Sequence, residues 1–323
     1  MSVNFDVLQS QNSLARPPSS LALVVNRLFF GVATLAAFSI IALVAFILYE
    51  IGRQATPAIM DYGARFLVDT AWDVQKSHFG ILPQIWGTLY SSLLALLIGG
   101  FVGITIAVFL TQDFLPPQFA VSFRTLIEML AAIPSVVFGL WGIFVVIPFI
   151  RPGANWLNEH FSSIPFFSSS LSGPGLLPAV IVLSIMILPT VAAISQDAIG
   201  LVPYKVKEAA YGMGTTKWEA ILKVILPTAS AGISSALVLG FGRALGETMA
   251  LAMLIGNSNQ ISLSLFSPAN TLAALLASNF PEAAQTERQA LMYAALILLA
   301  ITLVVNVIGT LILVWTSRKM GKA

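Results

Sequence analysis

Two charged residues stand four positions apart inside a long apolar stretch of this chain. Arg243 and Glu247 lie in the segment Gly-Arg-Ala-Leu-Gly-Glu-Thr, which ends at Thr248. On one unbroken helix, residues four apart share a face, so the two side chains are expected to pair. A guanidinium offers a planar fork of donors that matches an oxyanion, and it keeps its charge at any relevant pH. The segment therefore predicts an anion site, with Arg243 as ligand, Glu247 as its partner and Thr248 as a lesser polar contact.

The apolar surroundings of this pair favour one of two interpretations. An arginine at the centre of a membrane helix costs roughly 2.5–3.5 kcal/mol on insertion scales. A self-neutralising structural ion pair is one explanation, but paired buried charges stabilise a fold poorly. Ionisable residues inside a membrane usually mark a transport pathway, which is the interpretation we favour. Glu128, at the start of another apolar run, is either a further pathway residue or a charge that complements a helix end.

The composition places the chain in a lipid bilayer. Hydrophobic residues make up 57% of the sequence and charged residues only 9%, whereas soluble domains carry roughly 25% charged residues. A span needs about 20 apolar residues, and six runs qualify: Leu28–Tyr49, Ile85–Leu110, Leu126–Ile150, Leu176–Ser195, Ala229–Ile255 and Leu291–Trp315. The predicted fold class is all-α, a polytopic membrane protein with six transmembrane helices. Residues 1–26 are expected to form a polar tail, and residues 27–323 the transmembrane domain.

Other kinds of chemistry find little support in the sequence. There is no cysteine, which excludes disulfides and thiol catalysis. His78 and His160 are the two histidines and lie far apart, so no metal site is expected. No P-loop occurs, so ATP and magnesium must bind to another chain if ATP drives this one. The net charge of +2 gives no sign of nucleic-acid binding. We expect a non-catalytic membrane subunit without a cofactor of its own.

The distribution of lysine and arginine predicts the orientation. One set of loops and ends holds ten basic residues: Arg16, Arg27, Arg124, Lys205, Lys207, Lys217, Lys223, Arg318, Lys319 and Lys322. The opposite set holds five: Arg53, Arg65, Lys76, Arg151 and Arg288. Basic residues favour the cytoplasmic side, so both termini are predicted to be cytoplasmic.

The segment 53–78 on the opposite side has a periodic pattern of charges. Asp61, Arg65, Asp69 and Asp73 recur every four residues, which predicts an amphipathic helix at the outer membrane surface. A charged face turned to water explains the pattern. A contact for an external solute-binding protein is the functional alternative.

Proline and glycine mark two further features of the predicted spans. Pro134 lies within the predicted third span and is expected to kink that helix. Gly99 and Gly103 form a Gly-x3-Gly step in the second span, which predicts close helix packing.

A polar loop at residues 199–227 separates two of the predicted spans. It contains Glu208, Ala209 and Ala210, then Gly214 after three residues, and it ends in Leu-Pro. This spacing resembles the coupling loop of bacterial ABC importer permeases, which seats in a groove on an ATPase subunit. The alternative is a helical loop that only satisfies its own backbone. The resemblance favours docking, with these four residues as the coupling residues.

A more specific resemblance covers about residues 79–256. The segments GRALGETMA (242–250), EMLAAIPSVVFGLWG (128–142) and FGILP (79–83) look like those of PstC-type permeases of the bacterial high-affinity phosphate importer. PstA-type permeases usually continue Glu-Thr with Ala-Pro, whereas this chain has Met-Ala. The resemblance implies the MetI-like fold of type I ABC importer permeases and residence in the bacterial cytoplasmic (inner) membrane.

The resemblance also implies a machine of five chains. The partners would be a PstA-type permease, two PstB-type ATPase subunits and a PstS-type periplasmic phosphate-binding protein. Phosphate would cross by alternating access, driven by ATP on the ATPase subunits. The open alternatives are another oxyanion (sulfate, molybdate or a phosphonate), an ion-driven secondary transporter or channel, and a sensor scaffold that moves nothing.

Overall fold

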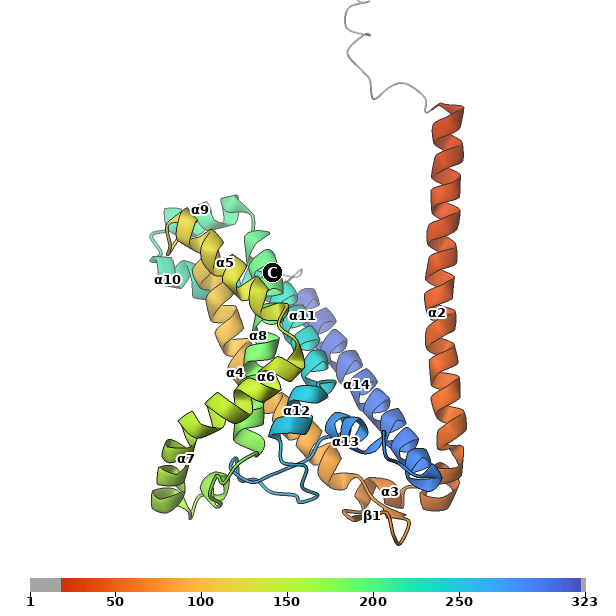
Figure 1. Cartoon of the computed structure of the whole chain (residues 1–323). Helices are drawn as coiled ribbons and strands as arrows, with labels where there is room; N and C mark the ends of the chain where they lie inside the picture. The colour runs from red at the N-terminus through yellow and green to blue at the C-terminus, as the bar shows by residue number, and fades with distance from the viewer. Residues whose placement is uncertain (1–18, 321–323) are drawn as a thin grey trace, which may run out of the picture. The chain divides into compact units, whose positions relative to one another are not determined.

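The computed structural model describes residues 19–320, without the side chains of residues 117 and 315–320. The described chain is mostly helical (Figure 1). The α-helices are α2 (Ser20–Tyr62), α3 (Arg65–Val68), α4 (Leu82–Thr111), α5 (Pro117–Ala131), α6 (Ser135–Trp141), α7 (Ile147–Phe161), α8 (Leu176–Gly200), α9 (Tyr204–Gly212), α10 (Lys217–Ala220), α11 (Leu226–Leu245), α12 (Met249–Leu254), α13 (Leu272–Asn279) and α14 (Gln285–Met320). Two π-helical segments, η2 (Gly142–Val146) and η4 (Ile221–Ile225), and a short 3-10 helix, η3 (Pro165–Phe167), complete the helical elements.

Six helical stretches of the described chain are long and apolar enough to span a membrane, which confirms the predicted fold class. They are Ser20–Tyr62, Leu82–Thr111, Ser135–Phe161, Leu176–Gly200, Lys217–Leu245 and Gln285–Val314. The first belongs mainly to a separate compact unit, residues 1–53, and residues 54–323 form the second unit. Residues 1–18 of the predicted tail lie outside the described residues. From Ser20 the rest of the predicted tail is helical and continuous with α2, and its cytoplasmic position stays a prediction.

The predicted amphipathic helix over 53–78 is wrong beyond Tyr62. Gly63 follows α2 with a φ of +52°, a conformation that glycine adopts without strain and that commonly ends a helix. Two of the periodic acids make turns instead of a helix face: Asp69 accepts from the N–H groups of Thr70 and Ala71, and Asp73 accepts from that of Lys76. Side-chain acceptors of this kind compete with helix formation. A two-stranded antiparallel hairpin follows, in which β1 (Trp72–Asp73) pairs with β2 (His78–Phe79).

The hairpin packs into a cluster that we call the hairpin end, made of residues 63–81, α13 and the first turns of α14. Phe66 and Phe79 are fully buried in it. Phe66 stacks on Tyr293 with ring centroids 4.5 Å apart. The carboxylate Oε1 of Glu287 accepts from Trp72 Nε1 at 3.2 Å and from Asn279 Nδ2 at 3.1 Å. This end of the molecule therefore satisfies a buried charge with its own side chains.

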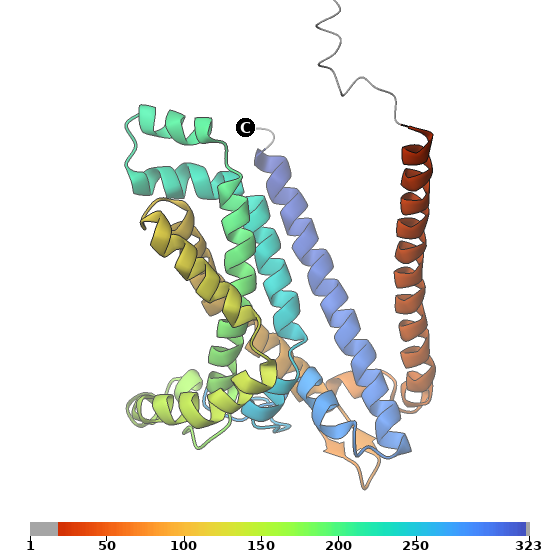
Figure 2. The same cartoon turned by 45° about the horizontal axis from the view of Figure 1, so that its top comes forward.

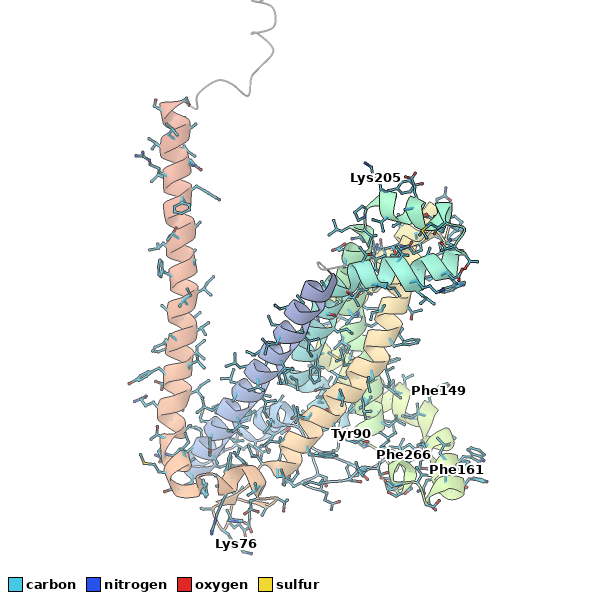
Figure 3. All side chains as sticks on the ribbon, turned by 180° about the vertical axis from the view of Figure 1, so that it is seen from behind. Lys76, Tyr90, Phe149, Phe161, Lys205 and Phe266 are labelled. Atoms are coloured by element: carbon cyan, nitrogen blue, oxygen red, sulfur yellow. The ribbon has the colours of Figure 1, made fainter. Side chains whose placement is uncertain are left out.

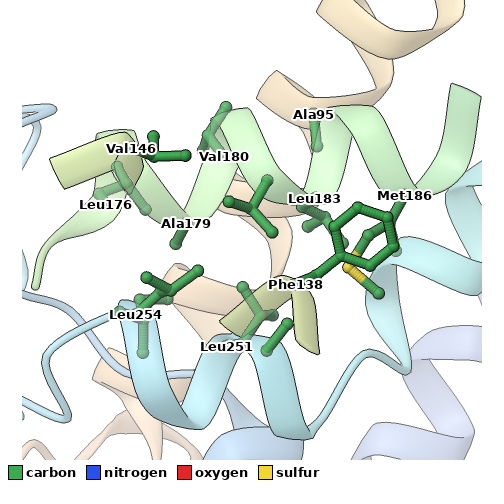
Figure 4. Close-up of a cluster of buried hydrophobic side chains, with 14 of the residues drawn as sticks. Ala95, Phe138, Val146, Leu176, Ala179, Val180, Leu183, Met186, Leu251 and Leu254 are labelled. Atoms are coloured by element: carbon green, nitrogen blue, oxygen red, sulfur yellow. The ribbon is translucent and has the colours of Figure 1, made fainter. Parts of the chain in front are cut away.

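The centre of the bundle is built around α8, the most buried of the six spans. Residues from α6, α8 and α12 interlock in its main apolar cluster (Figure 4). The Gly-x3-Gly step of α4 packs against α8, as predicted. A Cβ on Gly99 would lie 2.6 Å from the carbonyl oxygen of Ser184, and one on Gly103 would lie 3.1 Å from Val191. Glycine is needed at these positions because α8 comes so close.

Two predicted spans are broken. The third, expected at 126–150, is interrupted at residues 132–134, because Pro134 has an extended backbone and begins a new helix. From there α6, η2 and α7 run without a gap to Phe161. Pro134 therefore separates two helices and does not kink one. The fifth, expected at 229–255, stops at Leu245, and α12 starts only at Met249.

Candidate functional site

The break between α11 and α12 holds the charged motif. Arg243 lies in the last turn of α11, where a positive charge complements the negative end of the helix dipole. Its side chain is exposed, and Nη1 donates to the hydroxyl Oγ1 of Thr190 on α8 at 3.3 Å. The sequence alone did not point to Thr190, because it lies 53 positions away.

Glu247 does not pair with Arg243. No ion pair joins the two side chains in residues 19–320, which contradicts the predicted pairing. Gly246 ends the helix with φ −94° and ψ 1°, so the four-residue spacing no longer places both side chains on one face. Glu247 instead accepts from the N–H of Ala250, in the first turn of α12, at 3.3 Å. Thr248 precedes α12 and makes no side-chain cap.

This geometry leaves the guanidinium open to an anion. In the described part of the chain, Arg243 has a hydroxyl as its hydrogen-bond partner and no carboxylate within ion-pair distance. A guanidinium carries five N–H donors, so several remain for an oxyanion. The break itself is suited to such a role, because irregular backbone at membrane depth is tolerated where it lines a water-filled cavity or is covered by protein.

Glu128 is not brought together with the break. It lies on α5, where its Oε1 accepts from Arg124 Nε at 2.9 Å. These two side chains line a small cavity with Ala192, Ala193 and Gln196 of α8. Sequence reasoning counted Arg124 only toward the orientation, although its spacing of four from Glu128 indicates a pair on one helix.

The loop at 199–227 folds into two antiparallel helices, α9 and α10, that project from the ends of α8 and α11 (Figure 2). Glu208, Ala209 and Gly214 are exposed, and Ala210 is buried. Gly214 has a φ of +82°, and nothing lies within 4 Å of a Cβ built there. The turn thus requires glycine for its backbone conformation, since an added side chain would meet only open space.

Local bonds stabilise the loop at 199–227, which we call the elbow. The Thr215 hydroxyl donates to the carbonyl of Ala210 at 2.8 Å. Thr216 and Glu219 form a capping box at the start of α10. Lys217 Nζ lies 4.0 Å from the ring centre of Phe114 and donates to a backbone carbonyl in the connection between α4 and α5. The elbow is therefore anchored to the bundle at its base.

Several large apolar side chains of the elbow are exposed. We call residues 201–216 the loop end; Figure 3 marks it by Lys205, far from Lys76 of the hairpin end. Leu201, Tyr204 and Met213 are exposed by 82%, 73% and 85% of their surface. Tyr204 begins α9, and Met213 follows its last residue.

The two histidines are engaged separately. His78 Nε2 lies 3.0 Å from Asp69 Oδ2 in the hairpin end. His160 Nδ1 lies 2.9 Å from the carbonyl of Trp156 on α7. Within the described residues, no group of three or more potential ligands could hold a metal ion.

Comparison with known proteins gives concordant results. The family model described as binding-protein-dependent transport system inner membrane component matches residues 115–322. The chain is 40% identical over 295 residues to a phosphate transport system permease protein PstC of Xylella fastidiosa, covering 88% of this chain and 89% of that protein. It is 37% identical to the PstC protein of Haemophilus influenzae, covering 92% and 96% respectively.

Solved structures share the fold at low sequence identity. A bacterial alginate ABC transporter in complex with a pentasaccharide-bound periplasmic protein aligns over 90% of this chain and 96% of its own, with a TM-score of 0.59 and 17% identity. The MetNI methionine ABC transporter in an inward-facing conformation aligns over 73% and 95%, with a TM-score of 0.55 and 16% identity.

Proposed function

The chain belongs to the family of binding-protein-dependent transport system inner membrane components, and we propose how it moves its substrate. It is a multi-pass inner-membrane permease subunit of an ATP-driven importer, and its substrate is inorganic phosphate. The names of the relatives at 37–40% identity over most of both chains support that substrate. The observation that carries the proposal is Arg243, a guanidinium at the end of a spanning helix with a hydroxyl partner and no carboxylate paired to it among residues 19–320.

Arg243 binds the phosphate oxygens in this proposal. Thr190 orients the guanidinium of Arg243 through its hydroxyl. An anion can then bind Arg243 without breaking an ion pair, because none of the ion pairs in residues 19–320 involves this residue. Glu247 keeps the break in shape through the N–H of Ala250. The Glu247 carboxylate can also accept a hydrogen bond from the proton of hydrogen phosphate. A fully deprotonated oxyanion has no such proton. Thr248, half-buried beside it, is a further polar contact along the pathway.

The loop end docks on an ATPase subunit. Its exposed apolar side chains need a partner surface, and Glu208, Ala209 and Gly214 lie on the exposed side of the elbow. The excess of basic residues supports a cytoplasmic position for this loop and for both termini. ATP hydrolysis then belongs to the partner chains.

The family implies a second permease, ATPase subunits and a binding protein. The finer assignment is a PstA-type permease, two PstB-type ATPases and a PstS-type phosphate-binding protein. Closure of the ATPase dimer would move the elbow, and the helices that continue from it would open the pathway to the outside.

Replacing Arg243 by Gln tests the pathway. Uptake of radiolabelled phosphate should fall to background, while the complex stays in the membrane with its full complement of ATPase. Normal uptake by this variant would remove Arg243 from the pathway.

Competition by sulfate, molybdate and a phosphonate in the unmodified protein separates phosphate from the other oxyanions. Only the true substrate should compete at low concentration.

A further inference from the structure

The exposed side of α8 changes character along the helix. From the break toward the loop end, its exposed or half-exposed positions are Thr190, Ala193, Ile194, Gln196, Asp197, Ala198 and Gly200. Thr190, Ala193 and Asp197 are spaced by three and four residues and share one face, and Gln196 flanks it. Apart from Ile194 these positions are small or polar, on the most buried of the six spans. This face is thus unlike a surface that contacts lipid.

The surface expected to contact lipid is seen on α4 and α14. Exposed positions on α4 include Leu97, Phe101 and Phe109, and those on α14 include Leu303 and Val304. Large apolar side chains are the expected composition where a helix faces hydrocarbon. The contrast indicates that the polar face of α8 meets water or a polar solute.

Two arginines reach this face from different helices. Arg243 of α11 contacts it at Thr190. Arg124 of α5 lines a small cavity with Gln196, and the charge of Asp197 acts on its guanidinium. Seven residues separate Thr190 from Asp197, which corresponds to about 10.5 Å along the helix at the usual rise. An anion leaving Arg243 toward the loop end would therefore meet a second guanidinium two helical turns farther on.

We propose that Arg124 is a second anion contact on the phosphate pathway, between Arg243 and the loop end. This inference rests on the proposed function. Glu128 and Gln196 belong to the same contact, the first as the carboxylate that the anion displaces and the second as a neutral donor.

The two arginines differ in what an anion must displace. Arg243 faces a hydroxyl, whereas Arg124 is bonded to Glu128 at 2.9 Å and also feels Asp197. Nearby carboxylates repel an incoming anion and compete for the same donors. Phosphate is therefore held more weakly at Arg124 than at Arg243. Conduction needs sites that bind well enough to admit an ion and weakly enough to release it, so this order favours release toward the loop end.

Replacing Arg124 by Gln tests the contact in the complete transporter with its binding protein. The maximal rate of phosphate uptake, normalised to the ATPase subunits that co-purify, should fall roughly tenfold, the loss expected for one charge-assisted contact. The KM for external phosphate should not change, because capture from outside precedes this step. Arg124→Lys should retain part of the rate. Arg53→Gln is the matched control, because Arg53 forms another exposed pair, with Glu50 at 2.8 Å.

A charge-exchanged variant separates transport from a structural role. Arg124→Glu combined with Glu128→Arg restores an ion pair on α5 but moves the guanidinium by one helical turn. The proposal expects assembly without recovery of the rate. Recovery of the rate, or normal uptake by Arg124→Gln, would overturn it. Arg243→Gln measured in parallel keeps the two ideas apart, since its failure to transport supports the pathway whatever Arg124 does.

Discussion

The hairpin end and the loop end are both small elements attached to the same bundle, but they are stabilised in different ways (Figure 1). The hairpin end buries Phe66 and Phe79 and gives the Glu287 carboxylate two donors from the chain itself. The loop end leaves Tyr204 and Met213 exposed and relies on bonds within its own turn.

The proposed docking assigns the two ends different roles. Apolar surface left in water is unfavourable by roughly 25 cal/mol per Å², so covering Tyr204 and Met213 with a partner chain would stabilise the complex. Stability and docking should therefore depend on different ends. Changes at the hairpin end should alter unfolding, and changes at the loop end should alter assembly with the ATPase.

The largest effect is expected from Phe66→Ala. Truncating a fully buried phenylalanine typically costs about 3–5 kcal/mol, so the thermal unfolding midpoint in detergent should fall clearly. The amount of ATPase bound per folded permease should stay normal. Phe149→Ala is the matched control. Because Phe149 is 85% exposed, this variant should unfold like the unchanged protein. Loss of ATPase binding by the folded Phe66 variant would break the separation of the two ends.

A smaller effect is expected from Gly214→Val. A β-branched residue is strained at a φ of +82°, by about 1–2 kcal/mol or more for the left-handed conformation. The turn should shift, and less ATPase should co-purify with the permease. Gly153→Val is the control, since its position in α7 also has open space but an ordinary helical backbone, and it lies outside the loop end. A full complement of ATPase, together with normal uptake, would refute the docking role of the loop end.

The smallest effect concerns acid and the hairpin end. The N–H of Ala71 lowers the pKa of Asp69, with help from the N–H of Thr70 and the charge of His78. A lowered pKa stabilises the folded hairpin fully above the ordinary carboxylate value of about 3.9, and this contribution is lost as pH falls through the lower folded value. Amide exchange over residues 69–80, corrected for its intrinsic rate, should speed up only in that acidic range. Asp69→Asn should abolish the change, and an unaltered profile in that variant would contradict the assignment.

The sequence predicted the spans well where apolar runs are continuous. The predicted ranges 85–110 and 176–195 correspond closely to α4 and α8. It failed at the breaks, because apolar residues continue on both sides of Pro134 and of Gly246, so hydropathy does not register the interruption. Both residues were visible as helix breakers, but an interruption and a kink have the same signature in one sequence.

The candidate site was predictable in composition more than in geometry. The unusual charge of Arg243 within an apolar run could be recognised directly. Its contact with Thr190 could not, since it depends on how α8 packs against α11. The assumed pairing of Arg243 with Glu247 required an unbroken helix, and the error at Gly246 therefore passed from the fold to the site.

The two π-helical segments share one feature of sequence. The segment η2 is followed by Ile147 and Pro148, and η4 by Leu226 and Pro227. A π turn holds one residue more than an α turn, and it is the form a helix takes when it absorbs a single inserted residue without unwinding. Each segment therefore resets the helical phase by about 100°, the rotation contributed by one residue at 3.6 per turn. If one residue were gained or lost at η4, α10 would point in another direction, whereas the register between α11 and α8 would stay the same. The direction of the elbow can therefore evolve separately from the packing of the bundle.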